Sequence, residues 1–158
     1  MRLLVCLLLC LAATARAETL SGVVIVVIDG DTVLFKPDHY APLSRAFLKL
    51  RLAGIDAPES GQPHGAAAAR ALKSLVLKRR ATFDSLATDR YGRRIGWLNV
   101  AGDDASTQLV AQGHAWATGR APAELRRLAV AARQNKLGLW SADRPVPPWD
   151  WRAGHSEP

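Results

Sequence analysis

Two short acidic motifs, with an arginine ahead of the second, hold the residues of this chain best suited to chemistry. The first motif is Asp29-Gly30-Asp31-Thr32, the second is Asp56-Ala57-Pro58-Glu59, and Arg51 precedes the second. Each motif ends an apolar run, so both sets of carboxylates are expected at strand ends. Carboxylates that converge there can bind a hard divalent cation, and a guanidinium beside them can bind a phosphate. Cation, arginine and carboxylate together could cleave a phosphodiester.

Asp31 and Asp56 are the predicted metal ligands. Two ionised carboxylates repel each other unless a cation lies between them, and oxygen ligands favour Ca²⁺ or Mg²⁺ over zinc. Asp29 could support the ion through a water molecule. The alternative is that the Asp-Gly-Asp sequence only forms a hairpin turn, because Asp-Gly turns are common.

Glu59, Arg51 and Arg93 could act on the phosphate itself. A carboxylate near a metal-bound phosphate can orient or deprotonate a water molecule, although a single loop Glu is more often simply solvated. Guanidiniums can neutralise the charge that develops during in-line attack, and a charge inside an apolar strand, as at Arg51, is costly without a partner. Arg93 lies in a basic turn and could be only a surface residue. Arg90 and Tyr91 in the same turn offer a charge and a ring to a nucleotide, or merely pack the turn.

The apolar pattern predicts the elements that must position these residues. Strands are expected at Val23–Ile28, Thr32–Phe35, Phe47–Leu52, Thr82–Leu86 and Arg94–Val100. Helices are expected at Ala66–Arg80, at Asp104–Gln112, and from Pro122 to a stop at Gly138. Three strands, a helix, two strands and two helices fit an α+β fold, a five-stranded Greek-key barrel of the OB type with three α-helices. The tail from Arg144 is expected to be irregular and could pack on the body.

The first 17 residues have the features of a cleaved export signal. Arg2 is a short basic start, Leu3–Ala13 is apolar but too short to span a bilayer, and Ala15-Arg16-Ala17 is a cleavage signal. A membrane anchor or a lipoprotein modified at Cys10 are the alternatives. We therefore expect a signal peptide at 1–17, a single folded domain at 18–143, a tail at 144–158, and a periplasmic or secreted location. Both cysteines lie in the signal, so the mature domain has no disulfide.

The charge balance of the chain favours a polyanionic partner. The sequence contains 21 Lys and Arg against 14 Asp and Glu, a formal net charge of +7. Each phosphate that a basic residue neutralises releases counterions, which strengthens binding to nucleic acid. Simple solubility would explain the same charge, so the charge alone does not decide.

The motifs together resemble the staphylococcal nuclease (thermonuclease) family over about residues 21–141. The matching segments are Ile28–Thr32, Arg51–Glu59, Asp89–Arg93, Leu109–Gly113 and Gly138–Ser141. In this combination and order they are highly specific, whereas each alone would be weak. The resemblance implies a five-stranded barrel with three helices, and an enzyme that cuts DNA and RNA at the 5′ P–O bond and leaves 3′-phosphates.

The resemblance also implies a role for each site residue. Ca²⁺ would be held by Asp31, Asp56 and the main-chain oxygen of Ala57, with Asp29 in the outer shell. Glu59 would be the general base. Arg51 and Arg93 would bind the phosphate and stabilise the transition state, and the loop at residues 60–64 is shorter than in the classical enzyme.

The sequence thus predicts an exported, Ca²⁺-dependent endonuclease. Its partners would be DNA and RNA, with single-stranded or locally melted stretches preferred. We expect a monomer without stable membrane association once the signal is removed. A module of this fold that binds nucleic acid without cutting it is the competing hypothesis, and a structural protein with an incidental basic face is a more remote one.

Overall fold

The computed structural model describes residues 18–155 of the chain. The predicted signal peptide, with Cys6 and Cys10, lies outside these residues. Within them, no helix is both long enough and apolar enough to cross a membrane. The fold is therefore described from Glu18, which is also the residue at which the mature chain is expected to begin.

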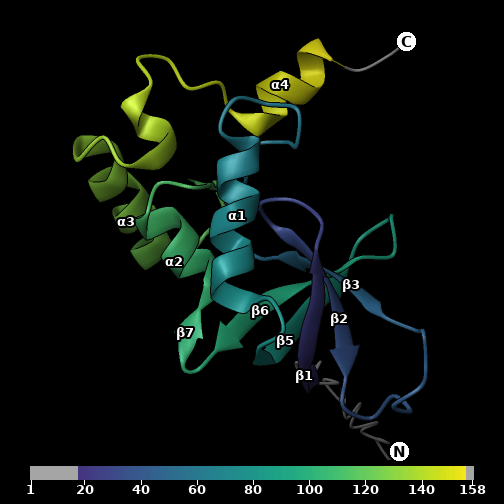
Figure 1. Cartoon of the computed structure of the whole chain (residues 1–158). Helices are drawn as coiled ribbons and strands as arrows, with labels where there is room; N and C mark the ends of the chain where they lie inside the picture. The colour runs from purple at the N-terminus through teal and green to yellow at the C-terminus, as the bar shows by residue number, and fades with distance from the viewer. Residues whose placement is uncertain (1–17, 156–158) are drawn as a thin grey trace, which may run out of the picture.

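Five strands close into a barrel (Figure 1). Antiparallel pairing joins the strands in the order β3-β2-β1-β5-β6, and a parallel pairing of β3 with β6 closes the ring. The predicted five-stranded barrel is thus confirmed. Its strands are β1 (Glu18–Val27), β2 (Thr32–Pro37), β3 (Leu48–Leu52), β5 (Arg80–Thr88) and β6 (Arg94–Val100).

Three two-residue strands extend this framework. β7 (Asp103–Asp104) pairs with the end of β6, while β4 (Ile55–Asp56) and β8 (Trp116–Ala117) form a separate small sheet. The β4–β8 pairing fixes the backbone of Asp56, one of the predicted metal ligands.

The barrel interior is filled by apolar side chains from alternate strand positions, as the period of two in a strand requires. Seven of these side chains are at most 1% exposed: Val24, Val33, Phe35, Leu50, Leu52, Phe83 and Leu98. Polar residues on the same strands, such as Lys49 and Arg51 on β3, face the other way. The core and the candidate site therefore use opposite faces of β3.

Four α-helices and one 3₁₀ helix complete residues 18–155, and in Figure 1 α1, α2 and α3 lie along one side of the barrel. α1 inserts the fully buried Ala68, Leu72 and Val76 into the core. Their bounds are α1 (Gly65–Val76), α2 (Ala105–Ala111), α3 (Ala123–Gln134), the 3₁₀ helix η1 (Gly138–Ser141) and α4 (Pro148–Gly154).

Two predicted helices end earlier than expected. The first stops at Val76, because Leu77 is extended beside Val24 and the Lys78 amide donates to the Val24 carbonyl at 2.8 Å. The third helix ends at Gln134 rather than Gly138, where the chain turns through a left-handed Lys136 with φ of 51°. Pairing with β1 in one case and a turn in the other overrides the helical pattern.

The three predicted helices are present as α1, α2 and α3, but the tail, which was expected to be irregular, forms a fourth helix, α4. Pro148 is buried at its first turn, a position where the missing N–H of proline costs nothing. Trp149 packs edge-on against Trp116, with 6.3 Å between ring centroids. These contacts hold the end of the chain against the body.

We expect Phe83→Ala to lower the free energy of unfolding by about 3–5 kcal/mol, because it leaves a cavity where a fully buried ring now fills the barrel. Urea unfolding of the mature protein measures the change. Leu43→Ala is the matched control, since Leu43 is 96% exposed and its truncation should change stability by less than about 0.5 kcal/mol. Equal effects of the two substitutions would contradict this packing.

Candidate active site

Main-chain pairing between β2 and β3 brings the first acidic motif to Arg51. Thr32 is paired with Arg51 across the two strands, and the Leu52 amide donates to the carbonyl of Asp31 at 2.9 Å. The chain then turns at Gly54, whose φ of 74° is readily adopted by glycine, and returns as β4. Asp56 therefore comes back to the strand that carries Arg51.

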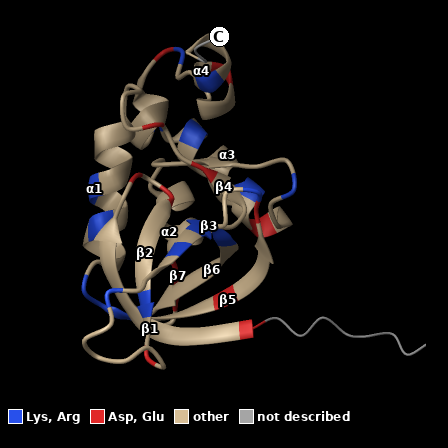
Figure 2. Ribbon diagram, turned by 90° about the vertical axis from the view of Figure 1, so that its right-hand side faces the viewer, with Lys and Arg blue, Asp and Glu red and all other residues tan. Residues whose placement is uncertain are grey.

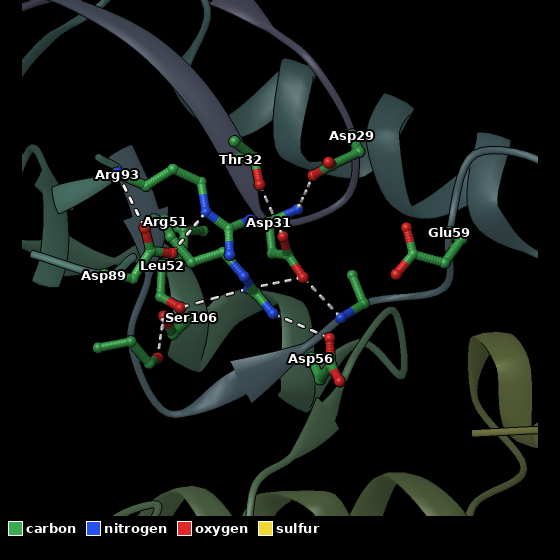
Figure 3. Close-up of polar contacts among 12 residues, drawn as sticks. Asp29, Asp31, Thr32, Arg51, Leu52, Asp56, Glu59, Asp89, Arg93 and Ser106 are labelled. Atoms are coloured by element: carbon green, nitrogen blue, oxygen red, sulfur yellow. Dashed lines mark hydrogen bonds and ion pairs between the residues drawn. The ribbon is translucent and has the colours of Figure 1, made fainter. Parts of the chain in front are cut away.

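Arg51 bridges the two aspartates (Figure 3). Its Nη1 lies 2.6 Å from Asp31 Oδ2 and its Nη2 lies 2.8 Å from Asp56 Oδ1. The Arg51 side chain is only 14% exposed, so both ion pairs are largely shielded from water. The two predicted metal ligands thus converge on one guanidinium.

Asp31 is the most strongly perturbed acid of the site. Burial raises its pKa to about 7, with a further rise from the charge of Asp29, although Arg51 acts in the opposite direction. The Ala57 amide donates to Asp31 Oδ2 at 2.8 Å, and the Thr32 hydroxyl donates to Oδ1 at 3.0 Å. A carboxylate this poorly solvated gains more than an exposed one from a nearby cation.

The donor set around Asp31 and Asp56 fits a hard ion that keeps part of its own hydration. Within residues 18–155, no three His, Cys, Asp or Glu side chains are grouped to hold a metal. An ion at these two aspartates would need a main-chain oxygen, such as that of Ala57, together with water or phosphate oxygens. Ca²⁺ and Mg²⁺ accept such mixed oxygen sets.

Asp29 has a clear local task. Its Oδ1 accepts a hydrogen bond from the Asp31 amide at 3.0 Å, which stabilises the turn between β1 and β2. This contact agrees with the hairpin interpretation of the Asp-Gly-Asp sequence. Its support of an ion through water stays a prediction.

Glu59 lies beside the Asp31–Arg51–Asp56 cluster rather than within it (Figure 3). Gln62 fixes the main chain of Glu59 through two hydrogen bonds. The Glu59 main-chain amide donates to Gln62 Oε1 at 3.0 Å, and the Gln62 main-chain amide donates to the Glu59 carbonyl at 2.9 Å. Gln62 is 5% exposed, and its side chain also donates to the carbonyl of Val146. The short loop is therefore tied to the C-terminal segment.

Arg93 reaches the same site from the turn before β6. Parallel pairing sets Leu50 against Arg94 and thereby brings this turn to the end of β3. Asp89 accepts from the Arg93 Nε at 2.8 Å and from its amide at 3.0 Å. Burial alone would raise the pKa of Asp89, but the hydrogen bonds from Arg93 and from the Tyr91 amide lower it below its usual value.

Arg90 and Tyr91 form the outer part of that turn. The Arg90 guanidinium lies 4.8 Å from the centroid of the Tyr91 ring, and its Nη2 donates to the Tyr91 hydroxyl at 2.6 Å. Tyr91 is 67% exposed, and the Arg93 guanidinium also lies 5.5 Å from its ring centroid, so a base that stacks there would meet both the ring and these charges.

All of the predicted site residues line one cavity. Figure 2 shows basic residues on β3 and on α4, with acidic residues in neighbouring loops. The cavity has a volume of about 520 Å³ and is lined by Asp29, Asp31, Lys49, Arg51, Asp56, Ala57, Pro58, Glu59, Arg90, Tyr91, Arg93 and Arg152.

Sequence reasoning missed four residues of this site. Lys49 could have been found, because it stands two positions before Arg51 and so shares its strand face. Asp89 was visible in the basic turn but received no role. Gln62 and Arg152 act through contacts that no local pattern reveals, and Arg152 reaches both Asp56 and Glu59 from α4.

Comparison with known proteins assigns the chain to a family. Residues 49–142 match the family described as staphylococcal nuclease homologue. The chain is 39% identical to "Protein ParB" of Escherichia coli, covering 91% of this chain and 85% of that protein. It is 38% identical to an "Uncharacterized endonuclease" of Escherichia coli O157:H7, covering 83% and 84%. It is 34% identical to "Micrococcal nuclease" of Shigella flexneri, covering 83% and 79%.

The chain therefore belongs to the staphylococcal nuclease family. The matched region contains Arg51, Asp56, Glu59 and Arg93, and it ends before α4. The predicted resemblance is confirmed, while the roles of the individual residues stay predictions.

Two histidines meet at the end of the Glu59 loop. His64 Nε2 lies 3.1 Å from His114 Nδ1, and the rings are stacked with 5.3 Å between centroids. Burial lowers the pKa of both imidazoles below the usual 6.5, helped by Arg70 at His64 and by His64 at His114. The pair joins the start of α1 to the segment after α2 as long as both rings do not become charged.

We expect this pair to make stability depend on pH. Because the folded pKa values are lowered, the unfolded chain binds protons that the folded chain does not, so stability falls as pH drops below about 6.5. Thermal unfolding of the wild type and of H64Q/H114Q between pH 7.5 and 5 measures this, and the difference between the two proteins should shrink as pH falls. Asp31 acts in the opposite direction in both proteins and cancels in the comparison. A pH-independent difference would contradict the prediction.

Proposed function

We propose that this protein is an exported, Ca²⁺-dependent phosphodiesterase that hydrolyses DNA and RNA with little sequence preference. The observation that carries the proposal is the convergence of Asp31, Arg51, Asp56, Glu59 and Arg93 on one cavity. In-line attack on phosphorus uses two carboxylates to hold a cation, a third carboxylate to act on water, and two guanidiniums to bind the phosphate.

Each residue has a task that its geometry supports. Ca²⁺ bound by Asp31 and Asp56, with the Ala57 carbonyl, would supply positive charge next to the scissile phosphate. Glu59 orients the attacking water and accepts its proton. The P–O5′ bond breaks as water adds to phosphorus, the leaving 5′ oxygen takes a proton from solvent, and the product keeps a 3′-phosphate.

The arginines bind the phosphoryl oxygens. A guanidinium has five N–H donors. Asp31 contacts Arg51 at Nη1 and Asp56 contacts it at Nη2, so the two aspartates do not use all of these donors. Arg51 can therefore hold its acidic partners and still donate to a phosphate. Arg93 is aimed by Asp89 in a fixed orientation, so little side-chain entropy is lost when it meets the developing charge.

The surroundings of the cavity suit an extended nucleic-acid strand. Lys49 and Arg90 add positive charge, and the exposed ring of Tyr91 offers a stacking surface that accepts any base. We infer a preference for single-stranded or locally melted substrate, because a base must be unpaired to stack there. The names of the "Micrococcal nuclease" and "Uncharacterized endonuclease" relatives support nuclease activity. Export and a monomeric state rest on the sequence.

We expect cleavage of single-stranded DNA by the mature protein to require Ca²⁺ and to stop with a chelator. End-group analysis should find 3′-phosphates. Mg²⁺ tested in parallel measures the choice of ion. Binding without cleavage under every condition would instead favour the nucleic-acid-binding module, and 5′-phosphate products would refute the assigned bond.

We expect Arg93→Ala and Arg51→Lys to lower kcat by about 10²- to 10³-fold, because each removes fork-like donors aimed at the transition state. Glu59→Gln should lower kcat by about 10²- to 10⁴-fold through loss of the base. Arg127→Ala is the control, since Arg127 is 79% exposed on α3 and does not line the cavity. Rates within a few-fold of the wild type for the arginine variants would rule out this mechanism.

A further inference from the structure

The last helix places an arginine directly on the catalytic carboxylates. Arg152 Nη2 lies 2.8 Å from Asp56 Oδ2, and its Nη1 lies 2.5 Å from Glu59 Oε1 and 3.3 Å from Asp56 Oδ1. The guanidinium thus contacts both the proposed metal ligand and the proposed base. No other described basic residue forms an ion pair with Glu59 within 4 Å in residues 18–155.

These contacts use the oxygens that the proposed reaction needs. Asp56 Oδ1 is paired with Arg51, and Oδ2 is paired with Arg152. A divalent cation that binds Asp56 must share or replace one of these partners, and two positive charges at that distance repel each other. The contact likewise occupies one acceptor position of Glu59 Oε1, so water must reach Glu59 at another position or displace Arg152.

Contacts away from the carboxylates hold Arg152 in place. We call residues 142–155 the C-terminal arm. Pro148 is buried, Trp149 packs against Trp116, and the Val146 carbonyl accepts from Gln62 at 2.5 Å. Because these contacts dock the arm independently of Asp56, Arg152 stays close to the site even when its ion pairs break, which gives it a high effective concentration there.

The arginine itself is able to move. Its side chain is 48% exposed, whereas the Arg51 side chain is 14% exposed and bridges two aspartates. Of the two cations on Asp56, Arg152 is therefore the one that can leave towards solvent without stranding a buried charge.

We propose that Arg152 sets the cation affinity of the site. It competes with the divalent cation for Asp56 and covers Glu59, so that it determines the ion concentration at which the enzyme works. The inference rests on the proposed function. With a cation held at Asp56, Arg152 would turn towards solvent, and the Glu59 carboxylate would be open to water.

Calcium binding by the full mature protein, measured by calorimetry without substrate, tests this competition. We expect Arg152→Ala to bind Ca²⁺ roughly tenfold more tightly than the wild type. Arg152→Lys should lie between them, because lysine keeps the charge but loses the two-pronged contact. Arg127→Ala removes the same charge on exposed α3 and should leave the Kd unchanged. Circular dichroism verifies that each variant is folded.

Cleavage assays supply the second readout. In Arg152→Ala the Ca²⁺ concentration for half-maximal rate should fall by a similar factor. An unchanged or weaker Ca²⁺ affinity in Arg152→Ala overturns the proposal, as does a raised KM with unchanged affinity, which would make Arg152 a substrate-binding residue.

Asp56→Asn separates this inference from the proposed function. If Asp56→Asn abolishes Ca²⁺ binding but Arg152→Ala leaves the Kd as it was, only the competition is refuted. If Asp56→Asn binds Ca²⁺ as the wild type does, the assigned metal site is wrong and both proposals are overturned.

Discussion

The bridge from Arg51 to Asp31 and Asp56 is the interaction on which the site depends. A guanidinium within a barrel strand is tolerable only because two carboxylates meet it, and two carboxylates that close together are tolerable only because a cation lies between them. Strand register, the Gly54 turn and the β4–β8 pairing all serve to bring these three groups together. The barrel therefore positions this charged cluster as well as enclosing the apolar core.

The barrel and the centre of the site could be predicted from sequence because their signals are local. A run of β-branched apolar residues and an Asp-Gly turn predict β1 and β2, and Arg51 and Asp56 lie close enough in the chain for one turn to join them. The residues alone left open whether Arg93 is a phosphate ligand or a surface residue, because its approach to Arg51 depends on the parallel pairing of β3 with β6. Hydrophobic pattern alone does not specify that closure.

The parts that escaped prediction depend on contacts between distant segments. The tail was expected to be irregular because four prolines interrupt it, yet Trp149 and Pro148 find an apolar surface on the body and a helix forms. α1 shows the reverse case. Lys78–Arg80 would suit the end of a helix, but the main chain there hydrogen-bonds to Val24 of β1 instead. In both cases tertiary packing outweighs the local preference of the segment.

The parallel closure of the barrel also has a consequence for when activity can begin. Arg51 and Arg93 come from opposite sides of the β3–β6 seam, so they share a cavity only after the long-range pairing of β3 with β6 has formed. A chain that is still unfolded during synthesis holds every candidate side chain but no assembled site. The topology therefore leaves this nuclease-family protein without an assembled site until its barrel has closed.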